Sequence, residues 1–328
     1  MILAGDIGGT KTVIARYEES GGSLRQVHSA TYHSRDFKSL ETILTAYLGD
    51  SPGVAPRAAC FDVAGPVFDG KCHTTNLPWD LDERDLARAI GAPRAKLLND
   101  LEATGYGILQ LPANELCVLN PGSRPGRRGN AAVIAAGTGL GEAILYWDGQ
   151  GHRPIATEGG HVDFAPRTDQ EIDLLRYLRT QIGGRVSVER VLSGPGFHEI
   201  YCFLRDSGHA AESPQLAALF RTEDPNPTIT RLGLSGEDPL CVATLQMFST
   251  LYGSEAGNLA LKCLAVGGVF VGGGIAPKIL PVLQDGSFLR GFTDKGRFTD
   301  FMKSLEVSVS LNQEAALLGA AYYALHNL

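Results

Sequence analysis

The pattern of apolar and polar positions predicts strands from the start of the chain. Residues 12–17, TVIARY, and 24–32, LRQVHSATY, are rich in β-branched and aromatic residues and predict two strands. Gly21 and Gly22 lie between them. A strand, a turn and a strand are therefore predicted where a P-loop or Rossmann turn would open a helix. The apolar runs 57–63 and 95–99 predict two buried strands.

Three other stretches predict helices. Residues 36–48 place Phe37, Leu40, Ile43, Leu44 and Tyr47 on one helical face. Residues 237–264 predict one long helix that begins at Asp238-Pro239 and is interrupted by Gly253 and Gly257. Residues 312–325 predict a terminal helix. Together with the strands, these helices indicate an α/β protein with mixed sheets.

Three glycine-rich clusters follow apolar strands: AGDIGGTKT at 4–12, AAGTGLG at 135–141, and VGGGI at 271–275. Glycine lets backbone N–H groups approach a polyphosphate because no Cβ atom is in the way. The second cluster repeats the strand, turn and strand of the first, so two hairpins would hold one polyphosphate from opposite sides. The third would lie against a ribose or base. A tight turn explains any one cluster, but three together favour a nucleotide site.

Composition narrows the class of protein. The 328 residues predict two lobes, and 36 acidic against 29 basic residues give a net charge of -7. A nucleic-acid partner is not expected, because the chain has no basic block beyond Arg127-Arg128. The six cysteines form no C-x-x-C pair, which favours reduced thiols over zinc or disulfides. No membrane span is expected, because the most apolar stretch, 259–276, contains Lys262 and many glycines.

Two polar residues follow the predicted strand 95–99 in the stretch LLNDLEATGYG. Asn99 and Asp100 stand at the end of this strand, where open α/β sheets present their ligands. Asp100 is the candidate catalytic carboxylate. The alternative is that Asp100 caps the following helix by accepting hydrogen bonds from backbone N–H groups.

A second polar group comes from two later stretches. TEGGHVDF at 157–164 carries Glu158 and His161, and SVERVLSGPG at 187–196 carries Glu189. Most single histidines bind no ligand, and Glu189 could form an ion pair with Arg190. Taken together, the carboxylates suit a neutral polyhydroxylated ligand, since one carboxylate accepts hydrogen bonds from two hydroxyl groups.

The motifs as a set resemble those of bacterial glucokinases, within the hexokinase, Hsp70 and actin superfamily. They occur in the same order: GDIGGTKT, LLNDLEATGYG, AAGTGLG, TEGGHVDFAPR, ERVLSGPG and GGVFVGGGI. The resemblance runs from Leu3 to about Leu325. It implies a two-lobed actin-like ATPase (ribonuclease H-like) fold with mixed central sheets and an interdomain cleft. The implied domains are a small one, 1–110 plus 311–328, and a large one, 111–310.

The resemblance also implies a role for each motif. Glucose would bind to Asn99, Asp100, Glu158, His161 and Glu189, with Asp100 as the catalytic base. ATP would bind to Gly5, Asp6, Ile7, Gly8, Gly9, Thr10, Lys11, Gly137, Thr138, Gly139, Gly141, Gly272, Gly273 and Gly274. Asp6 would stand in the outer shell of a Mg²⁺ ion that bridges the β- and γ-phosphates.

The implied reaction is transfer of the γ-phosphoryl group of ATP to the 6-hydroxyl group of D-glucose. Other readings are a kinase for fructose, mannose or an amino sugar, a sugar sensor without catalysis, and an actin- or chaperone-like ATPase. Two residues depart from the family pattern. Family members often have phenylalanine at the position of Leu101, and some have asparagine at the position of Lys11. The cysteine-rich zinc motif of the related repressor, open reading frame and kinase (ROK) family is absent. A cytoplasmic homodimer is expected, while the choice between ATP and polyphosphate stays open.

Overall fold

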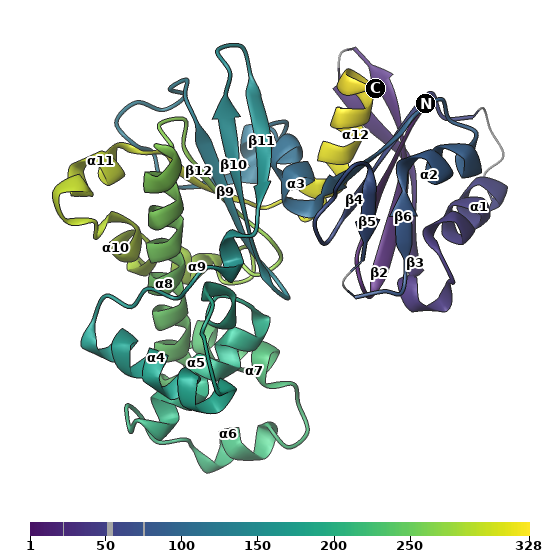
Figure 1. The fold of residues 1–328 in the computed structure, drawn as a ribbon. Helices are drawn as coiled ribbons and strands as arrows, with labels where there is room; N and C mark the ends of the chain where they lie inside the picture. The colour runs from purple at the N-terminus through teal and green to yellow at the C-terminus, as the bar shows by residue number, and fades with distance from the viewer. Residues whose placement is uncertain (22, 51–54, 75) are drawn as a thin grey trace. The chain divides into compact units, whose positions relative to one another are not determined.

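The computed structural model describes residues 1–21, 23–50, 55–74 and 76–328. The chain divides into two compact units (Figure 1). The first contains Met1–Pro112, Arg153–Ala156 and Asn312–Leu328, and the second contains Ala113–His152 and Thr157–Leu311. The first unit is therefore built from both ends of the chain.

The first unit is a mixed sheet with strand order β3-β2-β1-β4-β7. Its strands are β1 (Ile2–Ile7), β2 (Lys11–Ser20), β3 (Ser23–His33), β4 (Ala58–Val63) and β7 (Ala95–Asn99). β1 is antiparallel to β2 and parallel to β4, which is parallel to β7. The shorter strands β5 (Lys71–His73) and β6 (Asp80–Asp82) pair with each other. Its helices are α1 (Leu40–Asp50), α2 (Glu83–Ile90), α3 (Asp100–Ile108) and α12 (Ala315–Asn327), with a 3₁₀ turn, η1 (Ser34–Asp36).

The second unit is a mixed sheet with helices. Its strand order is β11-β10-β9-β12-β13-β8. The strands are β8 (Leu116–Asn120), β9 (Ala131–Ala136), β10 (Leu140–Trp147), β11 (His152–Thr157), β12 (Val269–Gly272) and β13 (Val307–Ser310). The helices are α4 (Asp169–Ile182), α5 (Gly194–Asp206), α6 (Pro214–Leu219), α7 (Pro225–Ser235), α8 (Pro239–Cys263), α9 (Leu280–Gln284), α10 (Ser287–Thr293) and α11 (Thr299–Ser304). Short 3₁₀ turns are η2 (Ala113–Glu115), η3 (Gly159–His161), η4 (Val188–Arg190) and η5 (Gly296–Phe298).

The two sheets repeat one arrangement. In the first, the antiparallel hairpin β1–β2 lies next to the parallel strands β4 and β7. In the second, the antiparallel hairpin β9–β10 lies next to the parallel strands β12 and β13. The predicted repetition of a strand, a glycine turn and a strand is therefore confirmed. The turn predicted at Gly21–Gly22 includes Gly22, which lies outside the described residues.

Two helix predictions were wrong in detail. α1 begins at Leu40 rather than at residue 36, because residues 34–36 form η1 and Ser34 is bound to the first glycine turn. α8 runs without interruption from Pro239 to Cys263, with Asp238 as its cap as predicted. Its glycines allow close packing: a Cβ atom on Gly253 would lie 1.9 Å from the carbonyl oxygen of Phe288.

Apolar side chains cover both faces of the first sheet. Because side chains alternate along a strand, Leu3 and Ile7 face the cluster formed with α1 and α2, while Ile2 and Ala4 face the cluster formed with α3 and α12. A separate cluster formed by β9, β12, α5 and α8 is the core of the second unit. Among the helices that the structure describes, none has the length and apolar character needed to cross a bilayer.

The contact between α3 and α12 depends on two glycines. A Cβ atom on Gly319 would lie 1.8 Å from the carbonyl oxygen of Ala103, and one on Gly107 would lie 1.7 Å from that of Ala315. We expect Gly319→Ala to lower the free energy of unfolding by about 1–3 kcal/mol, because the helices must separate. Urea denaturation measures this change.

The control for this substitution is Gly49→Ala in α1, where no described atom lies within 4 Å of the added Cβ. Alanine favours a helix over glycine by roughly 0.5–1 kcal/mol, so this variant should be as stable as the parent or more stable. Equal stability of the Gly319→Ala variant and the parent would contradict the close packing of α3 and α12.

Candidate active site

The polar residues of the first unit gather at one edge of its sheet. β1, β4 and β7 are parallel, so their carboxyl ends lie side by side. Asp6 stands near the end of β1, Asp62 near the end of β4, and Asn99 at the end of β7. Asp6 and Asp62 are register partners, so their side chains share one face of the sheet.

Asp62 is a residue that the sequence analysis did not single out. Its side chain is buried, no N–H or O–H group of the described residues donates to its carboxyl oxygens, and the carboxyl group of Asp6 lies close enough to share a proton with it. Burial, reinforced by the charges of Asp6 and Asp100, raises the pKa of Asp62 well above its usual value. The sequence feature that could have identified Asp62 is that it is an acidic residue inside the apolar run RAACFDV.

Asp6 lies in the same low-dielectric environment. Burial raises the pKa of Asp6, and the positive charge of Lys11 opposes this effect. A divalent cation near Asp6 would favour its ionised form in the same way. The predicted metal-side role of Asp6 therefore has a physical basis in its surroundings.

Asn99 rather than Asp100 caps α3. The Asn99 Oδ1 atom accepts hydrogen bonds from the backbone N–H groups of Leu101, at 2.9 Å, and Glu102, at 3.4 Å. The Asn99 amide nitrogen donates to the carbonyl oxygen of Gly65. Asp100 is the first residue of the helix, and its Oδ1 atom also accepts a hydrogen bond from the N–H group of Leu101. The helix cap that was the alternative role for Asp100 is therefore provided by Asn99.

Ser34 holds the first glycine turn. Its hydroxyl group donates to the carbonyl oxygen of Gly8 at 2.7 Å, and its N–H group donates to that of Thr10 at 2.9 Å. The Gly8 N–H group donates to the carbonyl oxygen of Lys11, which closes the turn. Two carbonyl oxygens, whose partial charge would repel a phosphate, are therefore engaged with Ser34.

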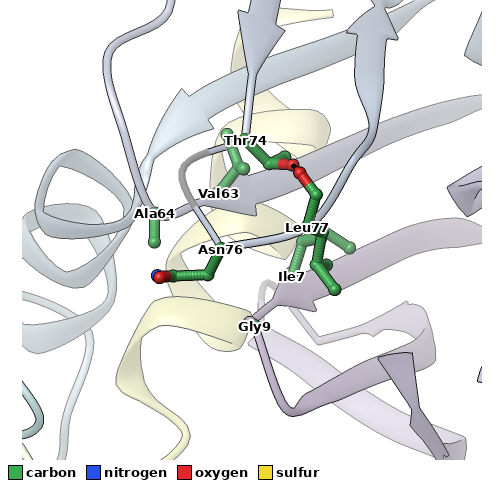
Figure 2. A pocket seen from close by; sticks show the side chains of 7 residues that line it. All are labelled: Ile7, Gly9, Val63, Ala64, Thr74, Asn76 and Leu77. Carbon is green, nitrogen blue, oxygen red and sulfur yellow. Dashed lines mark hydrogen bonds between the residues drawn. The ribbon is translucent and has the colours of Figure 1, made fainter. Parts of the chain in front are cut away.

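A small cavity of about 10 Å³ lies beside this turn, and it has room for about one water molecule (Figure 2). Its lining residues are Ile7, Gly9, Val63, Ala64, Thr74, Asn76 and Leu77. A Cβ atom on Gly9 would lie 2.6 Å from the Cβ atom of Asn76. Gly9 therefore lets the loop that contains Asn76 pack directly on the turn.

In the second unit, two glycine clusters meet at the ends of neighbouring parallel strands. β9 leads into Gly137–Gly139, and β12 leads into Gly273. Gly273 has a φ of +80°, and a Cβ atom on it would lie 2.4 Å from the carbonyl oxygen of Ala136. Because only glycine adopts this conformation readily, the second and third glycine clusters can lie together.

Glu158, His161 and Glu189 also lie together. The His161 Nε2 atom is 3.9 Å from Glu158 Oε2, and its Nδ1 atom is 4.0 Å from Glu189 Oε1. About 60% of the Glu158 side chain and 59% of the His161 side chain are exposed, against 30% for Glu189. The sequence places these residues in two separate stretches, and the fold brings them to one surface of the second unit.

Backbone pairing brings these two stretches together. The Phe164 N–H group donates to the carbonyl oxygen of Val186, and the Val188 N–H group donates to that of Val162. Arg185 binds the carboxylate of Asp163 and the carbonyl oxygen of His161. The turns η3 and η4, which carry the three polar residues, are therefore held side by side.

Glu189 is also bound to the second glycine hairpin. Its Oε2 atom accepts a hydrogen bond from the N–H group of Leu140 at 3.0 Å. A Cβ atom on Gly139 would lie 2.5 Å from the same oxygen. The predicted phosphate turn and the predicted sugar residue Glu189 are thus in direct contact within this unit.

The sequence is similar to known glucokinases over its length. The sequence model of the family described as "Glucokinase" matches residues 3–327. The chain is 43% identical to the glucokinase of Nostoc punctiforme over 334 residues, which cover 98% of each chain. It is 42% identical to the glucokinase of Synechocystis sp., with 97% of this chain and 96% of that protein covered.

Solved structures of similar fold include the crystal structure of a glucokinase from an Antarctic psychrotroph. It has a TM-score of 0.85 and 31% identity, and 99% of both chains is covered. A ROK family glucokinase from Streptomyces griseus, crystallised with glucose and AMPPNP, has a TM-score of 0.66 and 21% identity over 99% of both chains. At this lower identity the likeness is one of fold.

The contact between Gly139 and Glu189 can be tested with two matched substitutions. Gly139→Ala places a methyl group against Glu189, so we expect it to raise the KM for glucose as well as that for ATP. At Gly137 no described atom lies within 4 Å of an added Cβ, so Gly137→Ala should raise the KM for ATP alone. Steady-state kinetics with each substrate varied in turn measure both values.

Thermal unfolding of both variants controls for a loss of folded protein. If Gly139→Ala and Gly137→Ala changed the two KM values in the same proportion, the separate effect on Glu189 would be refuted.

Proposed function

The chain belongs to the glucokinase family, and we propose that it transfers the γ-phosphoryl group of ATP to the 6-hydroxyl group of D-glucose with Asp100 as the base. Glucose phosphorylation by ATP is the activity of the family, and the resemblance predicted from the motifs is confirmed. The predicted actin-like ATPase fold is confirmed as well. The cytoplasmic location and the homodimer stay predictions.

The position of Asp100 carries the assignment of the base. It begins α3 at the carboxyl end of β7, and Asn99 supplies the helix cap. The positive end of the helix dipole stabilises a carboxylate at this position, so Asp100 is held ready to accept a proton. Phosphoryl transfer mainly requires positioning and neutralisation of charge. Asp100 would orient the 6-hydroxyl group and take its proton late in the reaction.

The other hydroxyl groups of the sugar would bind to Asn99, Glu158, His161 and Glu189. Support comes from the cluster that the last three form and from the carboxylates of Glu158 and Glu189. A carboxylate that pairs with two hydroxyl groups discriminates against sugars that lack them. The ROK family glucokinase was crystallised with glucose and with AMPPNP, an analogue of ATP.

The nucleotide would bind to the glycine turns. Gly5 to Lys11 of the first unit and Gly137, Thr138, Gly139 and Gly141 of the second would approach the phosphates. Gly272, Gly273 and Gly274 would lie against the adenosine. Support comes from the matched positions of the two hairpins in the two sheets.

Magnesium fits the carboxyl groups at the end of β1. Mg²⁺ is bound by one or two carboxylates together with phosphate oxygens and water. Asp6 and Asp62 are neighbouring buried carboxyl groups whose pKa values are raised by burial, so a cation would offset the cost of ionising them. When bound, the ion would neutralise charge on the β- and γ-phosphates, with Asp6 holding it through water.

The function is tested by ADP release in the presence of a panel of hexoses. Glucose should give the highest kcat/KM, and fructose, mannose and amino sugars should give lower values. A higher kcat/KM for another hexose would show that this hexose, and not glucose, is the preferred substrate. ADP release that needs no sugar would refute the kinase assignment.

The role of Asp100 is tested by Asp100→Asn. We expect kcat to fall by about 10²-fold or more, while calorimetry gives glucose and ATP affinities within a few-fold of the parent. The control is Asp85→Asn, which changes an exposed aspartate in the first turn of α2 and should leave kcat unchanged. A normal kcat in Asp100→Asn would refute its role as base.

The role of Glu158 is tested by Glu158→Gln, which keeps the shape of the side chain and removes its charge. A hydrogen bond to a charged group contributes about 1.5–3 kcal/mol, so the Kd for glucose should rise roughly 10- to 150-fold. Glu237→Gln, at an exposed glutamate before α8, is the control. Unchanged glucose binding in Glu158→Gln would remove this residue from the sugar site.

A further inference from the structure

Glu142 is a buried acidic residue with no role in the reaction described above. It lies on β10, directly after the second glycine hairpin, and 1% of it is exposed. Its Oε1 atom has no hydrogen-bond partner within the described ranges. A buried carboxyl group in this state is costly, so its presence requires a physical reason.

The turn η3 rests on this residue. A Cβ atom on Gly159 would lie 2.2 Å from the Glu142 Oε2 atom, so the backbone of the turn is in contact with the carboxyl group. The Thr157 hydroxyl group donates to the carbonyl oxygen of Glu142 at 2.8 Å and accepts from the Gly159 N–H group at 3.1 Å. Glu142 therefore supports the segment that carries Glu158 and His161.

The charged groups around Glu142 come mainly from α8. Glu255 and Lys262 face it from this helix, while its register partner on β9 is the apolar Ile134. Tyr252, also on α8, forms hydrogen bonds through its hydroxyl group with the backbone of β9 and β12. Glu158 and His161 on the turn above are more than half exposed, so water screens their charges.

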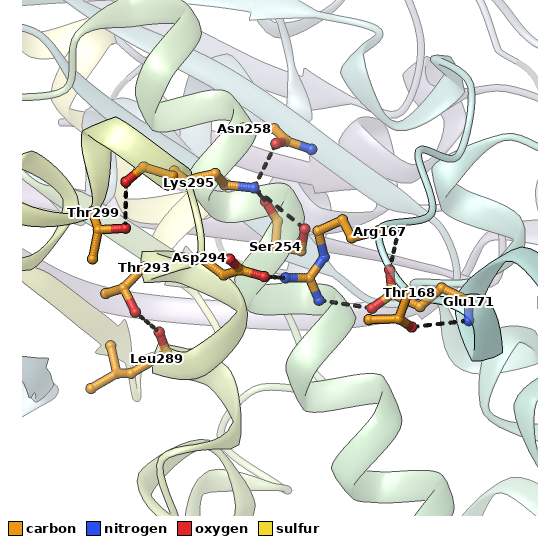
Figure 3. A network of polar contacts seen from close by, with 11 residues as sticks. Arg167, Thr168, Glu171, Ser254, Asn258, Leu289, Thr293, Asp294, Lys295 and Thr299 are labelled. Carbon is orange, nitrogen blue, oxygen red and sulfur yellow. Dashed lines mark hydrogen bonds and ion pairs between the residues drawn. The ribbon is translucent and has the colours of Figure 1, made fainter.

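Glu255 has polar partners on its own helix. The Asn258 amide nitrogen donates to its Oε2 atom at 2.9 Å, and the Lys262 ammonium group lies 3.5 Å from Oε1. Lys295 binds Asn258 Oδ1 at 2.7 Å, which fixes the orientation of that amide, as Figure 3 shows. Two neighbouring buried carboxyl groups are costly to ionise together, and the proximity of Glu255 adds to the effect of burial on the pKa of Glu142.

We propose that Glu142 is a positioning residue for the sugar-binding turn: its uncharged carboxyl group supports the segment Thr157–His161, and its ionised form displaces that segment. This inference rests on the proposed sugar-binding roles of Glu158 and His161. An ionised carboxylate at this position needs water. The backbone of Gly159 packs directly on the Glu142 carboxyl group and that of Gly160 on Leu140, so water reaches the carboxylate only if the turn moves away.

The direction of the pH effect follows from the proton equilibrium. Burial and the neighbouring Glu255 raise the pKa of Glu142 to about 7, while Lys262 acts in the opposite direction. Below pH 7 the carboxyl group is neutral and the turn is supported. Above pH 7 the group loses its proton, so glucose affinity falls as pH rises, and glucose binding takes up a proton.

The test compares the parent with Glu142→Gln, an uncharged group of the same shape. For the parent, we expect the Kd for glucose to rise about tenfold or more between pH 6.5 and pH 8.5. Glu142→Gln should bind glucose as the parent does at pH 6.5 and keep that affinity at pH 8.5. Calorimetry in buffers of different ionisation enthalpy should show proton uptake at pH 8 for the parent and little for the variant.

Three further variants separate positioning from a general effect of charge. Glu255→Gln removes the negative neighbour and lowers the pKa of Glu142, so the loss of affinity should begin at a lower pH. Glu237→Gln makes the same charge change at an exposed position and should keep the parent's pH profile. Glu142→Ala removes the support and should weaken glucose binding at both pH values, with thermal unfolding as the check on folding.

The results distinguish this inference from the proposed function. A parent without glucose-dependent ADP release at any pH would refute the kinase assignment. An active parent whose glucose affinity depends on pH in the same way as that of Glu142→Gln would overturn the role of Glu142. So would normal glucose affinity in a folded Glu142→Ala variant.

Discussion

Parallel strand pairing sets the position of the acidic groups in the first unit and of the glycine turns in the second. β1, β4 and β7 end at one edge of the first sheet, so Asp6, Asp62 and Asp100 lie near one another although they are far apart in the sequence. β9 and β12 end together in the second sheet, which brings Gly137 next to Gly273. The rest of each sheet is then free to be apolar, and the strands can bury both of their faces.

Buried carboxyl groups are the main cost of this arrangement. Asp62 in the first unit and Glu142 in the second both hold their protons more tightly than usual, because ionisation in an apolar surrounding is unfavourable. A chain selected for stability alone would place apolar residues there. They lie beside the first glycine turn and under η3, so the structure gives up stability at the places where we propose that ligands bind.

Glycine has two different roles in this fold. At Gly107 and Gly319 it lets two helix backbones touch, and at Gly253 it lets α8 approach the end of α10. At Gly9, Gly139 and Gly159 it lets a turn lie against a side chain of the candidate site. Both roles exclude a Cβ atom, so a glycine in the sequence does not reveal whether it serves packing or ligand binding.

The sequence determined the features that depend on neighbouring residues: the strands around the glycine turns, the cap of α8 at Asp238, and the motifs that identify the family. The roles of Asp100, Glu158 and His161 stay predictions from those motifs. Only the tertiary structure decided that η1 takes the place of the first turn expected for α1, that α8 continues through its glycines, and that Asp62 and Glu142 are buried carboxyl groups with raised pKa values. These features depend on contacts between residues far apart in the chain, which local periodicity does not contain.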